Sequence, residues 1–220
     1  MKYIASVSWG KDSTAMLLLL IKEKMPLDEV VFYNTGFEFE AIYKVRDYFI
    51  NKYLKPLNIK YIELAPKRPF KETMLNYEHM TRKGTIKRGY GWCGGLCRWG
   101  TTEKLQSINK YCKDAVQYIG IAYDEPQRYE RLTQNKKAPL YEMKITEAEA
   151  LQICYDAGVD FDGLYKILKR VSCWCCRNKN LQELRAYKEH LPQYFKMLCE
   201  LEEQIGEPMK KPIYLKDRFK

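Results

Sequence analysis

The sequence has no long hydrophobic run. Its longest uninterrupted apolar stretch is Ala15–Ile21, far too short to cross a membrane. It also lacks low-complexity stretches and repeats of fixed period, which argues against a disordered or a solenoid protein. The polar segment Ser8–Ser13 follows the first residue too closely to leave room for a secretory signal peptide. We therefore expect a cytoplasmic protein with no membrane partner.

The composition is that of an ordinary globular protein. Its 220 residues are 46% hydrophobic and 30% charged, which suits one domain with at most a small appendage. The net charge of +10 fits either a polyanionic partner, such as a nucleotide or nucleic acid, or a basic solubilising surface. The segment His79–Thr102 contains five basic residues and no acidic one, and the tail from Pro208 is also basic. Two such concentrations favour contacts with anions.

Strand-like and helix-like segments alternate in the first half of the chain. Residues 2–7, 29–33, 59–64 and 115–121 read as buried strands, and residues 12–24 and 39–54 read as helices. This alternation predicts an α/β fold with a mostly parallel, Rossmann-like sheet and helices on both faces. Ligands of such sheets bind beyond the carboxyl ends of the strands. The loops expected there are Ser8–Ser13, Asn34–Glu38 and Gly120–Glu125.

The rest of the chain is predicted to be less regular at first and then helical. We expect residues 1–125 to form a nucleotide-binding core, interrupted by a glycine-, cysteine- and base-rich insertion at about residues 67–100. Six of the twelve glycines fall within Gly84–Gly100, which predicts a mobile or irregular loop. Residues 126–220 should form a helical part that carries a cysteine pair and the basic tail. Capping-box patterns at Thr146 and Asn180 predict helix starts, and Pro192 predicts a helix break.

The segment Ser8-Trp9-Gly10-Lys11-Asp12-Ser13 is the strongest candidate for a phosphate site. Gly10 should allow a tight turn, Lys11 supplies a cation, and the following helix directs free N–H groups at an anion. Asp12 beside a phosphate makes sense if it holds a metal, caps the helix or orients Lys11. The alternative is an ordinary polar strand–helix turn. The loop is not a Walker A motif, whose first glycine is missing.

This loop resembles the pyrophosphate loop of the PP-loop ATPase superfamily, in particular its phosphoadenosine phosphosulfate (PAPS) reductase-like branch. Three further segments resemble that branch in the same order: Thr35-Gly36-Phe37-Glu38, Trp92-Cys93 and Gly120–Glu125. The resemblance extends from Lys2 to about Leu201 and implies an adenine nucleotide α-hydrolase-like fold.

The resemblance also implies a nucleotide site and a reaction. The phosphates of ATP or a related adenine nucleotide would lie at Ser8, Gly10, Lys11, Asp12 and Ser13. Thr35, Gly36 and Gly120 would line the nucleotide crevice. Asp124, Glu125 and Arg128 would stand near the phosphate or the leaving group, so that these three join Lys11 and Asp12 as candidate catalytic residues. Members of the superfamily that use ATP release pyrophosphate and adenylylate an acceptor, which would require Mg²⁺ to neutralise the phosphates.

Eight cysteines in a chain without an export signal point to metal binding or redox chemistry. Cys93 and Cys97 form one pair, and Cys173-Trp174-Cys175-Cys176 contains a second. We expect Cys93, Cys97, Cys173 and Cys176 to bind a metal, since four thiolates suit a zinc ion or an iron–sulfur cluster. Cys175 would be a spare thiol, an alternate ligand or a sulfur carrier.

Thiolates alone do not choose between the metals, and buried hydrophobic cysteines or a redox disulfide are the alternatives. The resemblance favours a [4Fe-4S] cluster over Zn²⁺, because some members of the superfamily carry such a cluster. The neighbouring Arg98, Lys169, Arg170 and Arg177 should lower the pKa values of the thiols. Cys112, Cys154 and Cys199 are expected to be core residues.

Two other signals carry little weight. Gly89-Tyr90-Gly91-Trp92-Cys93-Gly94 matches a dinucleotide-binding pattern, but it follows a polar segment rather than a strand. His79 and His190 are isolated and are expected to be surface or capping residues.

The aromatic and basic residues between Arg88 and Trp99 could stack on a single-stranded nucleic acid or form a lid over the nucleotide.

The sequence therefore predicts an enzyme that adenylylates an acceptor for sulfur insertion. The acceptor could be tRNA, DNA or a small molecule, and a sulfur-donor protein could take part. One alternative is a PAPS or adenylyl-sulfate reductase, but the Glu-Cys-Gly-type motif of a mobile C-terminal cysteine is missing, and Cys199 lies in a helical pattern. The other alternative is a regulatory protein that binds a nucleotide without turnover and has a structural metal site.

Overall fold

The computed structural model describes residues 1–93 and 95–220, which form two compact units. The first, here called the sheet unit, comprises Met1–Asn34, Phe39–Ala65 and Leu105–Leu164. The second, the cysteine unit, comprises Thr35–Glu38, Pro66–Lys104 and Tyr165–Lys220. The expected insertion thus belongs to the same unit as the C-terminal residues. The domain boundary expected at residue 125 stays a prediction.

The sheet unit is built on a five-stranded sheet with the strand order β3-β2-β1-β6-β7. The strands are β1 (Lys2–Ser6), β2 (Glu29–Tyr33), β3 (Lys60–Leu64), β6 (Ala115–Ile119) and β7 (Lys136–Lys137). All four pairs of neighbours are parallel. The predicted α/β fold with a mostly parallel sheet is therefore confirmed. The short strand β7 was not expected.

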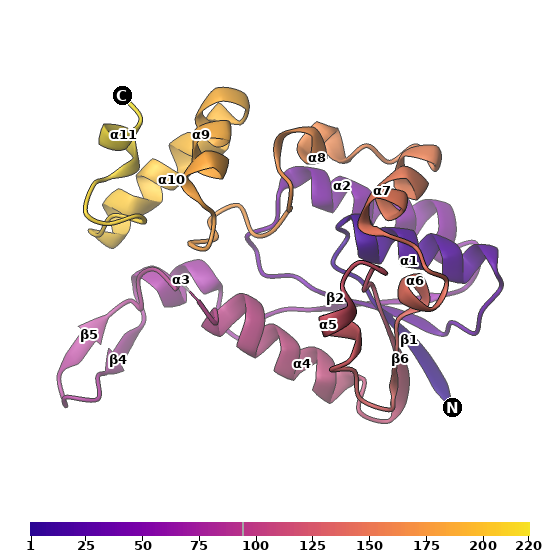
Figure 1. Cartoon of the computed structure of the whole chain (residues 1–220). Coiled ribbons are helices and arrows are strands. Elements are labelled where there is room, and N and C mark those ends of the chain that lie inside the picture. The colour runs from indigo at the N-terminus through magenta and orange to yellow at the C-terminus, as the bar shows by residue number, and fades with distance from the viewer. Residues whose placement is uncertain (94) are drawn as a thin grey trace. The chain divides into compact units, whose positions relative to one another are not determined.

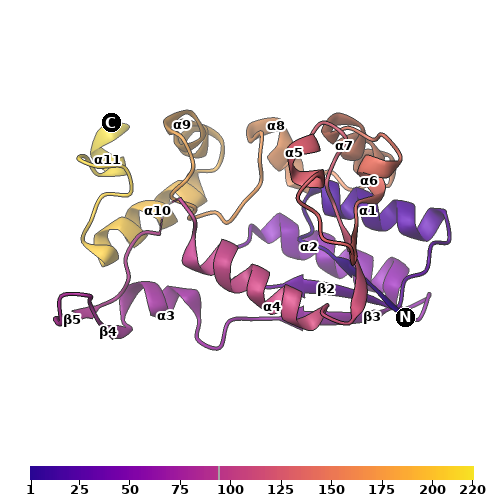
Figure 2. The ribbon, with the colours of Figure 1, turned by 60° about the horizontal axis from the view of Figure 1, so that its bottom comes forward.

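Helices cover this sheet on both faces. They are α1 (Lys11–Lys22), α2 (Glu40–Phe49), the π-helix η1 (Ile50–Leu54), α4 (Lys104–Tyr111), α5 (Pro126–Tyr129), α6 (Pro139–Glu142), α7 (Glu147–Asp156) and the 3-10 helix η3 (Phe161–Gly163). Figures 1 and 2 show α1 and α2 on one face and α4 on the other. The helix α7 begins at the expected capping box of Thr146 and Glu149. The strand β2 is buried along its whole length, as strands covered on both faces are.

The cysteine unit is mostly helical. Its elements are α3 (Phe70–Leu75), β4 (Glu78–Met80), β5 (Ile86–Arg88), the π-helix η2 (Arg98–Glu103), α8 (Leu164–Ile167), α9 (Leu181–His190), α10 (Pro192–Ile205) and α11 (Leu215–Arg218). The expectation of an irregular glycine-rich loop is wrong for two parts of it, because β4 and β5 form an antiparallel hairpin and Arg98–Glu103 is helical. Pro192 separates α9 from α10, as predicted.

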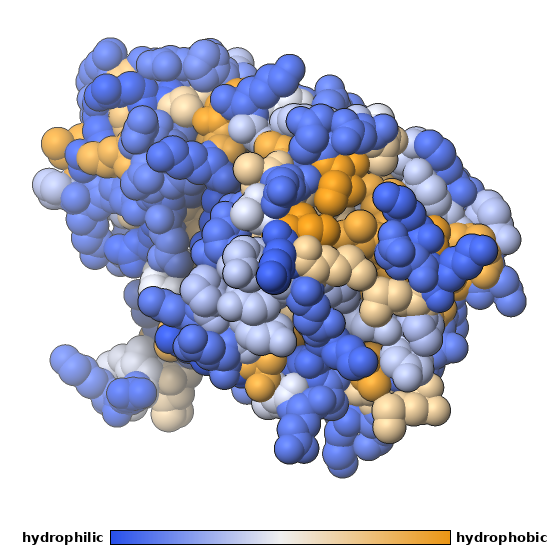
Figure 3. Space-filling view, turned by 45° about the vertical axis from the view of Figure 1, so that its right-hand side comes forward, coloured by the Kyte–Doolittle hydropathy of each residue, from blue (hydrophilic) through white to orange (hydrophobic). Residues whose placement is uncertain are grey.

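Charged and polar residues dominate the visible surface. On the face shown in Figure 3, hydrophilic residues cover most of the area, and hydrophobic residues gather in a patch right of the centre. No helix within the described ranges is both long and apolar enough to span a membrane.

A buried carboxylate fastens the C-terminal segment to α10. Glu202 is 1% exposed and accepts hydrogen bonds from the backbone N–H groups of Met209 (2.6 Å) and Leu215 (2.7 Å). Replacing Glu202 with alanine leaves two buried N–H groups without an acceptor. We expect the free energy of unfolding in urea to fall by about 2–4 kcal/mol. The control is Glu203→Ala, which removes only an exposed ion pair with Lys216 and should cost less than about 1 kcal/mol. Equal losses for both variants would contradict the prediction.

Candidate functional site

The segment Ser8–Ser13 connects β1 to α1 and turns at a residue other than the expected one. Gly10 has an ordinary φ of −80°, whereas Trp9 has a φ of 60° in the left-handed region. The expectation that Gly10 allows the tight turn is therefore wrong. The Trp9 side chain is fully buried and packs against the rings of Phe32 and Phe49. Burial of this indole compensates for the cost of the left-handed conformation and anchors the loop in the core.

The hydroxyl of Ser13 closes the loop. Its Oγ accepts the backbone N–H of Ser8 (3.1 Å), lies 3.1 Å from the hydroxyl of Ser8, and donates to the carbonyl of Gly10 (3.1 Å). Ser13 is buried, whereas Ser8 is exposed. The loop is thus preorganised around the first turn of α1, where a helix offers N–H groups without intrahelical acceptors to an anion.

Lys11 lies at the start of α1 and is only 7% exposed. Its Nζ donates to Asp12 Oδ1 (2.6 Å) and to Glu147 Oε2 (2.8 Å). Of the three roles considered for Asp12, the orientation of Lys11 is the one that this hydrogen bond supports. Burial alone would lower the pKa of Lys11, but the hydrogen bonds and charges of Asp12 and Glu147 outweigh it and raise the pKa. The amine therefore stays protonated at neutral pH.

The pKa of Asp12 is raised. Burial is the main cause, and the charges of Glu147 and Glu125 add to it against the opposing effect of Lys11. Three carboxylates thus act on one another around a single buried amine. Such an arrangement favours the arrival of a cation, which would relieve their mutual repulsion.

The loop after β6 lies directly against the phosphate-loop candidate. Ser6 at the end of β1 pairs with Ile119 at the end of β6, so the two loops leave the sheet side by side. A Cβ atom on Gly120 would lie 2.8 Å from the backbone N and Cα of Ser13. Gly120 therefore allows the two loops to approach each other. Its expected place in a nucleotide crevice stays a prediction.

Replacing Gly120 with alanine should force these loops apart. We expect the free energy of unfolding to fall by about 1–3 kcal/mol, because the clash involves backbone atoms that have nowhere to move. Thermal or urea unfolding measures this. Gly100→Ala is the control, since its new Cβ would lie at an ordinary 3.8 Å from the nearest atom. Wild-type stability of Gly120→Ala would contradict the packing described here.

The three other candidate catalytic residues lie on the loop after β6 and at the start of α5. Asp124 Oδ1 accepts the backbone N–H of Glu147 (3.0 Å), which places α7 so that Glu147 reaches Lys11. Arg128 donates to Glu125 Oε1 at 2.6 Å, and both Asp124 and Arg128 are exposed. The sheet unit thus contains the loop residues together with Gly120, Asp124, Glu125 and Arg128.

The two remaining nucleotide candidates belong to the cysteine unit. Thr35 Oγ1 accepts the N–H of Phe37 (3.1 Å), donates to Glu38 (2.8 Å) and lies 3.7 Å from the sulfur of Cys173. Gly36 has a φ of 76°, which favours glycine. In the structure, this turn supports the second cysteine segment, since the N–H of Trp174 donates to the carbonyl of Phe37 (2.9 Å).

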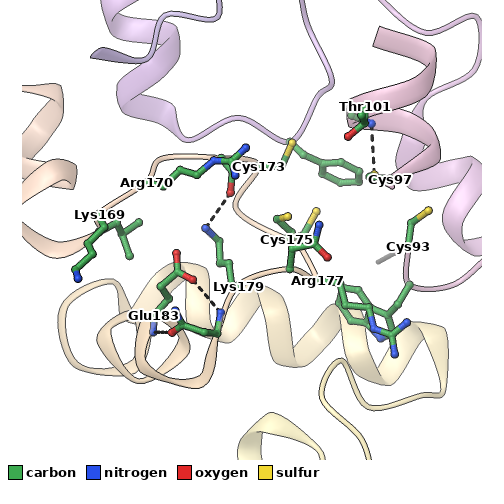
Figure 4. A pocket seen from close by; sticks show the side chains of 18 of the residues that line it. Cys93, Cys97, Thr101, Lys169, Arg170, Cys173, Cys175, Arg177, Lys179 and Glu183 are labelled. Carbon is green, nitrogen blue, oxygen red and sulfur yellow. Dashed lines mark hydrogen bonds between the residues drawn. The ribbon is translucent and has the colours of Figure 1, made fainter. Parts of the chain in front are cut away.

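The cysteine unit contains a cavity of about 690 Å³. The cysteines that line it are Cys93, Cys97, Cys173, Cys175 and Cys176. Basic residues that line it are Lys166, Lys169, Arg170, Arg177 and Lys179. Figure 4 shows Cys93 and Cys97 on the segment leading into η2, and Cys173 and Cys175 on the loop after α8. The structure thus brings both cysteine pairs to one cavity with a positively charged lining. Gly94, between the first two cysteines, lies outside the described residues.

The thiols around this cavity differ in acidity. The pKa of Cys97 is lowered to about 6 by a hydrogen bond from Cys93 and by the N–H groups of Gly100, Trp99 and Thr101 at the start of η2. The pKa of Cys93 is raised by that same hydrogen bond and by burial. Burial raises the pKa of Cys173 to about 12 and that of Cys175 well above its usual value. The expected acidification by flanking basic residues is thus wrong for Cys173 and Cys175, because burial dominates there.

This difference predicts the pH dependence of alkylation. Only the thiolate reacts, so in protein treated with a chelator iodoacetamide should modify Cys97 with a rate that rises with pH and has its midpoint near 6. Cys173 should stay unmodified up to pH 9, because its pKa is about 12. Peptide mass spectrometry after timed labelling measures both. Faster labelling of Cys173 than of Cys97 at pH 7 would contradict this order.

The chemistry of the donor set fits a thiolate-bound metal site, since one cavity is lined by five cysteines and several cations that offset negative charge. Among the residues that the structure describes, however, no three His, Cys, Asp or Glu side chains lie close enough together to hold a metal ion. The assignment of Cys93, Cys97, Cys173 and Cys176 as ligands therefore stays a prediction. Cys112 and Cys154 are buried in the sheet unit, and Cys199 is half-buried in α10.

Comparison with known proteins identifies the family. A family model of the phosphoadenosine phosphosulfate reductase domain matches residues 2–151. The chain belongs to this family. The matched range of the reductase domain family includes Ser8–Ser13, Gly120–Glu125 and the pair Cys93 and Cys97, but it ends before Cys173 and Cys176. The second cysteine pair is thus a feature of this chain beyond the family match.

Two individual proteins are also similar. The uncharacterized protein MJ0066 of Methanocaldococcus jannaschii is 26% identical over 204 residues, which cover 86% of this chain and 39% of that protein. This chain therefore spans about two fifths of that relative's length. The U34-tRNA thiolase NcsA from Methanococcus maripaludis with its [4Fe-4S] cluster matches with a TM-score of 0.47 and 15% identity, over 94% of this chain and 73% of that one.

Sequence reasoning missed two residues of these sites. Glu147 directly follows the predicted helix cap at Thr146, but no local signal shows that it reaches Lys11 across 136 positions. Lys179 is 2% exposed, lines the cysteine cavity and donates to Ser172 Oγ (3.3 Å). Burial lowers the pKa of Lys179, and the nearby Glu183 and cysteines oppose this effect. Its position three residues after Cys176 was the available signal.

Proposed function

We propose that this protein binds ATP or a related adenine nucleotide at Ser8–Ser13 and cleaves it at the α-phosphate. Pyrophosphate is released, and an acceptor is adenylylated in preparation for sulfur insertion. The observation that carries the proposal is the buried, protonated amine of Lys11, held at the start of α1 beside the loops that follow β1 and β6. This is the edge at which parallel sheets bind ligands, and the strand order changes direction between these two strands.

In this proposal the loop binds the phosphates through three kinds of group. The amine of Lys11 supplies positive charge, the hydroxyls of Ser8 and Ser13 supply hydrogen bonds, and the first turn of α1 supplies N–H groups. Gly10 brings the backbone close to the nucleotide, and Gly120 lines the crevice within the sheet unit. The roles expected for Thr35 and Gly36, which belong to the cysteine unit, stay predictions. The ion pairs of Lys11 with Asp12 and Glu147 hold the amine in place before the nucleotide binds. Such preorganisation stabilises the charge that develops in the transition state.

Mg²⁺ would be held by carboxylate oxygens, and Asp12 and Glu147 are the residues that would supply them. Carboxylate oxygens suit a hard cation, and the charges of Glu147 and Glu125 both act on Asp12. Bound magnesium supplies charge neutralisation to the phosphates. Asp124 positions α7. Arg128, which is hydrogen-bonded to Glu125, would interact with the leaving group.

The cysteine cavity would serve the sulfur step. Cys93, Cys97, Cys173 and Cys176 would hold a [4Fe-4S] cluster in preference to Zn²⁺, and Cys175 would be a spare thiol, an alternate ligand or a sulfur carrier. Bound by all four thiolates, such a cluster would have no iron open to sulfur, so binding sulfur at an iron would require one of these cysteines to leave it. The acceptor is a nucleic acid, tRNA or DNA, and a sulfur-donor protein is a further partner. The basic surface supports this choice of acceptor.

Incubation with ATP labelled at the α-phosphate tests the proposal. The expected products are AMP and pyrophosphate, with label transferred to the acceptor when one is present. Release of ADP and phosphate would overturn the assignment to the α-phosphate. Binding of ATP without any turnover would instead support a regulatory protein.

A sulfonucleotide reductase is disfavoured by the place of the last cysteine. Cys199 lies inside α10, half-buried and followed by six further helical residues. A reductase of that type needs a mobile thiol to attack sulfur. Thioredoxin-dependent release of sulfite from PAPS would reverse this conclusion.

A further inference from the structure

The β4–β5 hairpin is a structured ribbon within the cysteine unit. Its register pairs Glu78 with Arg88, His79 with Lys87 and Met80 with Ile86. At its base, Gly89 adopts a φ of 66°, and the N–H groups of Tyr90 and Gly91 donate to carbonyls of α3 at 3.2 and 3.0 Å. Figures 1 and 2 show the hairpin extending from the end of α3. The ribbon is therefore anchored at one end and presents its tip.

The tip is a short turn that carries two cations. The N–H of Thr81 donates to the carbonyl of Thr85 (2.8 Å), and their hydroxyls lie 2.7 Å apart. Gly84 has a φ of 77°, which completes a three-residue connection of a known hairpin type. The connection places Arg82 and Lys83 at the end of the ribbon, and both are exposed.

Positive charge continues from the tip along the ribbon. Lys87 and Arg88 are exposed on β5, and Arg88 also donates to the side chain of Asn76 (2.9 Å). Glu78 is the only acidic residue between Asn76 and Thr102 in the sequence. A ribbon with four cations and one carboxylate is complementary to a polyanion.

The aromatic residues near the hairpin are already engaged with one another. The rings of His79 and Tyr90 stack at 3.8 Å, and the guanidinium of Arg98 lies 4.0 Å from the centre of the Tyr90 ring. Both faces of Tyr90 are therefore covered. Trp92 and Trp99, also considered for stacking, are 9% and 4% exposed. These rings support the ribbon and leave little aromatic surface for unstacked bases, which argues against a single-stranded ligand.

One face of the ribbon is apolar at its outer end. Met80 and Ile86 are 72% and 74% exposed, and they lie opposite each other across the two strands. The major groove of B-form DNA admits a two-stranded ribbon, and its thymine methyl groups accept apolar contacts. RNA has no such methyl group, and its deep, narrow major groove excludes side chains. Cations beside an exposed apolar pair therefore fit duplex DNA better than duplex RNA.

We propose that the β4–β5 hairpin docks in the major groove of duplex DNA, with Arg82, Lys83 and Lys87 on phosphates and with Met80 and Ile86 against base edges. This inference rests on the proposed nucleic-acid acceptor and narrows it to DNA. It assigns to the insertion a binding role separate from the nucleotide loop.

Fluorescence anisotropy with a labelled, AT-rich DNA duplex tests the electrostatic part, without ATP in the buffer. Arg82→Gln with Lys83→Gln should weaken binding several-fold and should reduce the slope of log Kd against log salt concentration by about 2. The matched control is Lys110→Gln with Lys113→Gln, two exposed lysines far from the hairpin in the sequence. Equal effects of the two double variants would overturn the proposal, as would duplex RNA or single-stranded DNA of the same sequence binding more tightly than duplex DNA.

Replacing thymine with uracil in the same duplex tests the apolar contact. Wild-type protein should bind the thymine duplex more tightly than the uracil duplex, and Met80→Ser with Ile86→Ser should abolish that difference. Circular dichroism of each variant checks that the fold is retained. Identical affinity of the wild type for both duplexes would refute contact with the base edges. Because no nucleotide is turned over here, a negative result leaves the ATP reaction untouched, and failed ATP cleavage leaves the DNA result standing.

Discussion

Replacing Lys11 with alanine is expected to lower the rate of AMP and pyrophosphate formation by at least about 10²-fold. In the proposed function this side chain is the cation that binds the phosphates, and it is buried and held by two carboxylates. Removing it also leaves Asp12 and Glu147 without their shared counterion. The resulting repulsion should weaken phosphate binding further. Initial rates with labelled ATP at several concentrations measure the effect.

Lys22→Ala is the matched control for this variant. Lys22 lies on the same helix, at its exposed C-terminal end, so its removal tests the loss of a lysine from α1 without touching the loop. Its rate should stay within about twofold of the wild type, because surface substitutions rarely matter beyond a fraction of a kcal/mol. A Lys11→Ala protein that is folded and turns over ATP at the rate of the Lys22→Ala protein would contradict the role of the loop.

Replacing Cys97 or Cys176 with serine should remove the metal. Four thiolates bind a structural metal with about 10–16 kcal/mol, so the loss of one removes about a quarter of that, or more than about 10²-fold in affinity. Anaerobic purification followed by iron and zinc analysis and an absorption spectrum should show a large loss for each variant. Four iron atoms per chain in the wild type would support the [4Fe-4S] assignment.

Two controls make this experiment sharper. Cys199→Ser changes a half-buried thiol of α10 away from the cavity and should keep the metal. Cys175→Ser should also keep it if Cys175 is a spare thiol or carrier. Loss of metal from Cys175→Ser with retention in Cys176→Ser would exchange these two residues in the ligand set. A wild-type protein with no bound metal would contradict the site as a whole.

The sequence predicted the sheet and its helices because their signals are local. Strands such as Glu29–Tyr33 are short, β-branched and aromatic, and the capping boxes at Thr146 and Asn180 act within four residues. The same holds for the loop, whose residues are consecutive. It was therefore predictable that Lys11 would lie where a helix begins after a strand, at the carboxyl edge of the sheet.

Other features depend on contacts between distant residues. Glu147 meets Lys11 only because α7 is placed beside α1, partly by Asp124. The left-handed turn falls at Trp9 because the core has room for its indole, a fact that no pattern around Gly10 reveals. The glycines within Gly84–Gly100 predicted a mobile or irregular loop, whereas Gly84 and Gly89 each supply a backbone conformation that the hairpin needs. The pKa values of the cysteines likewise follow from burial at Cys173 and Cys175 and from hydrogen bonds at Cys97, which charge in the sequence does not report.

The account depends on one claim: the loop after β1 binds a nucleoside triphosphate through Lys11 and Ser13. Isothermal titration calorimetry with ATP and Mg²⁺ tests it most directly, on the wild type, on Lys11→Ala with Ser13→Ala, and on Lys22→Ala. We expect the loop variant to lose most of its affinity for ATP and the control to keep it. Unchanged ATP affinity in a folded Lys11→Ala, Ser13→Ala protein would contradict the account.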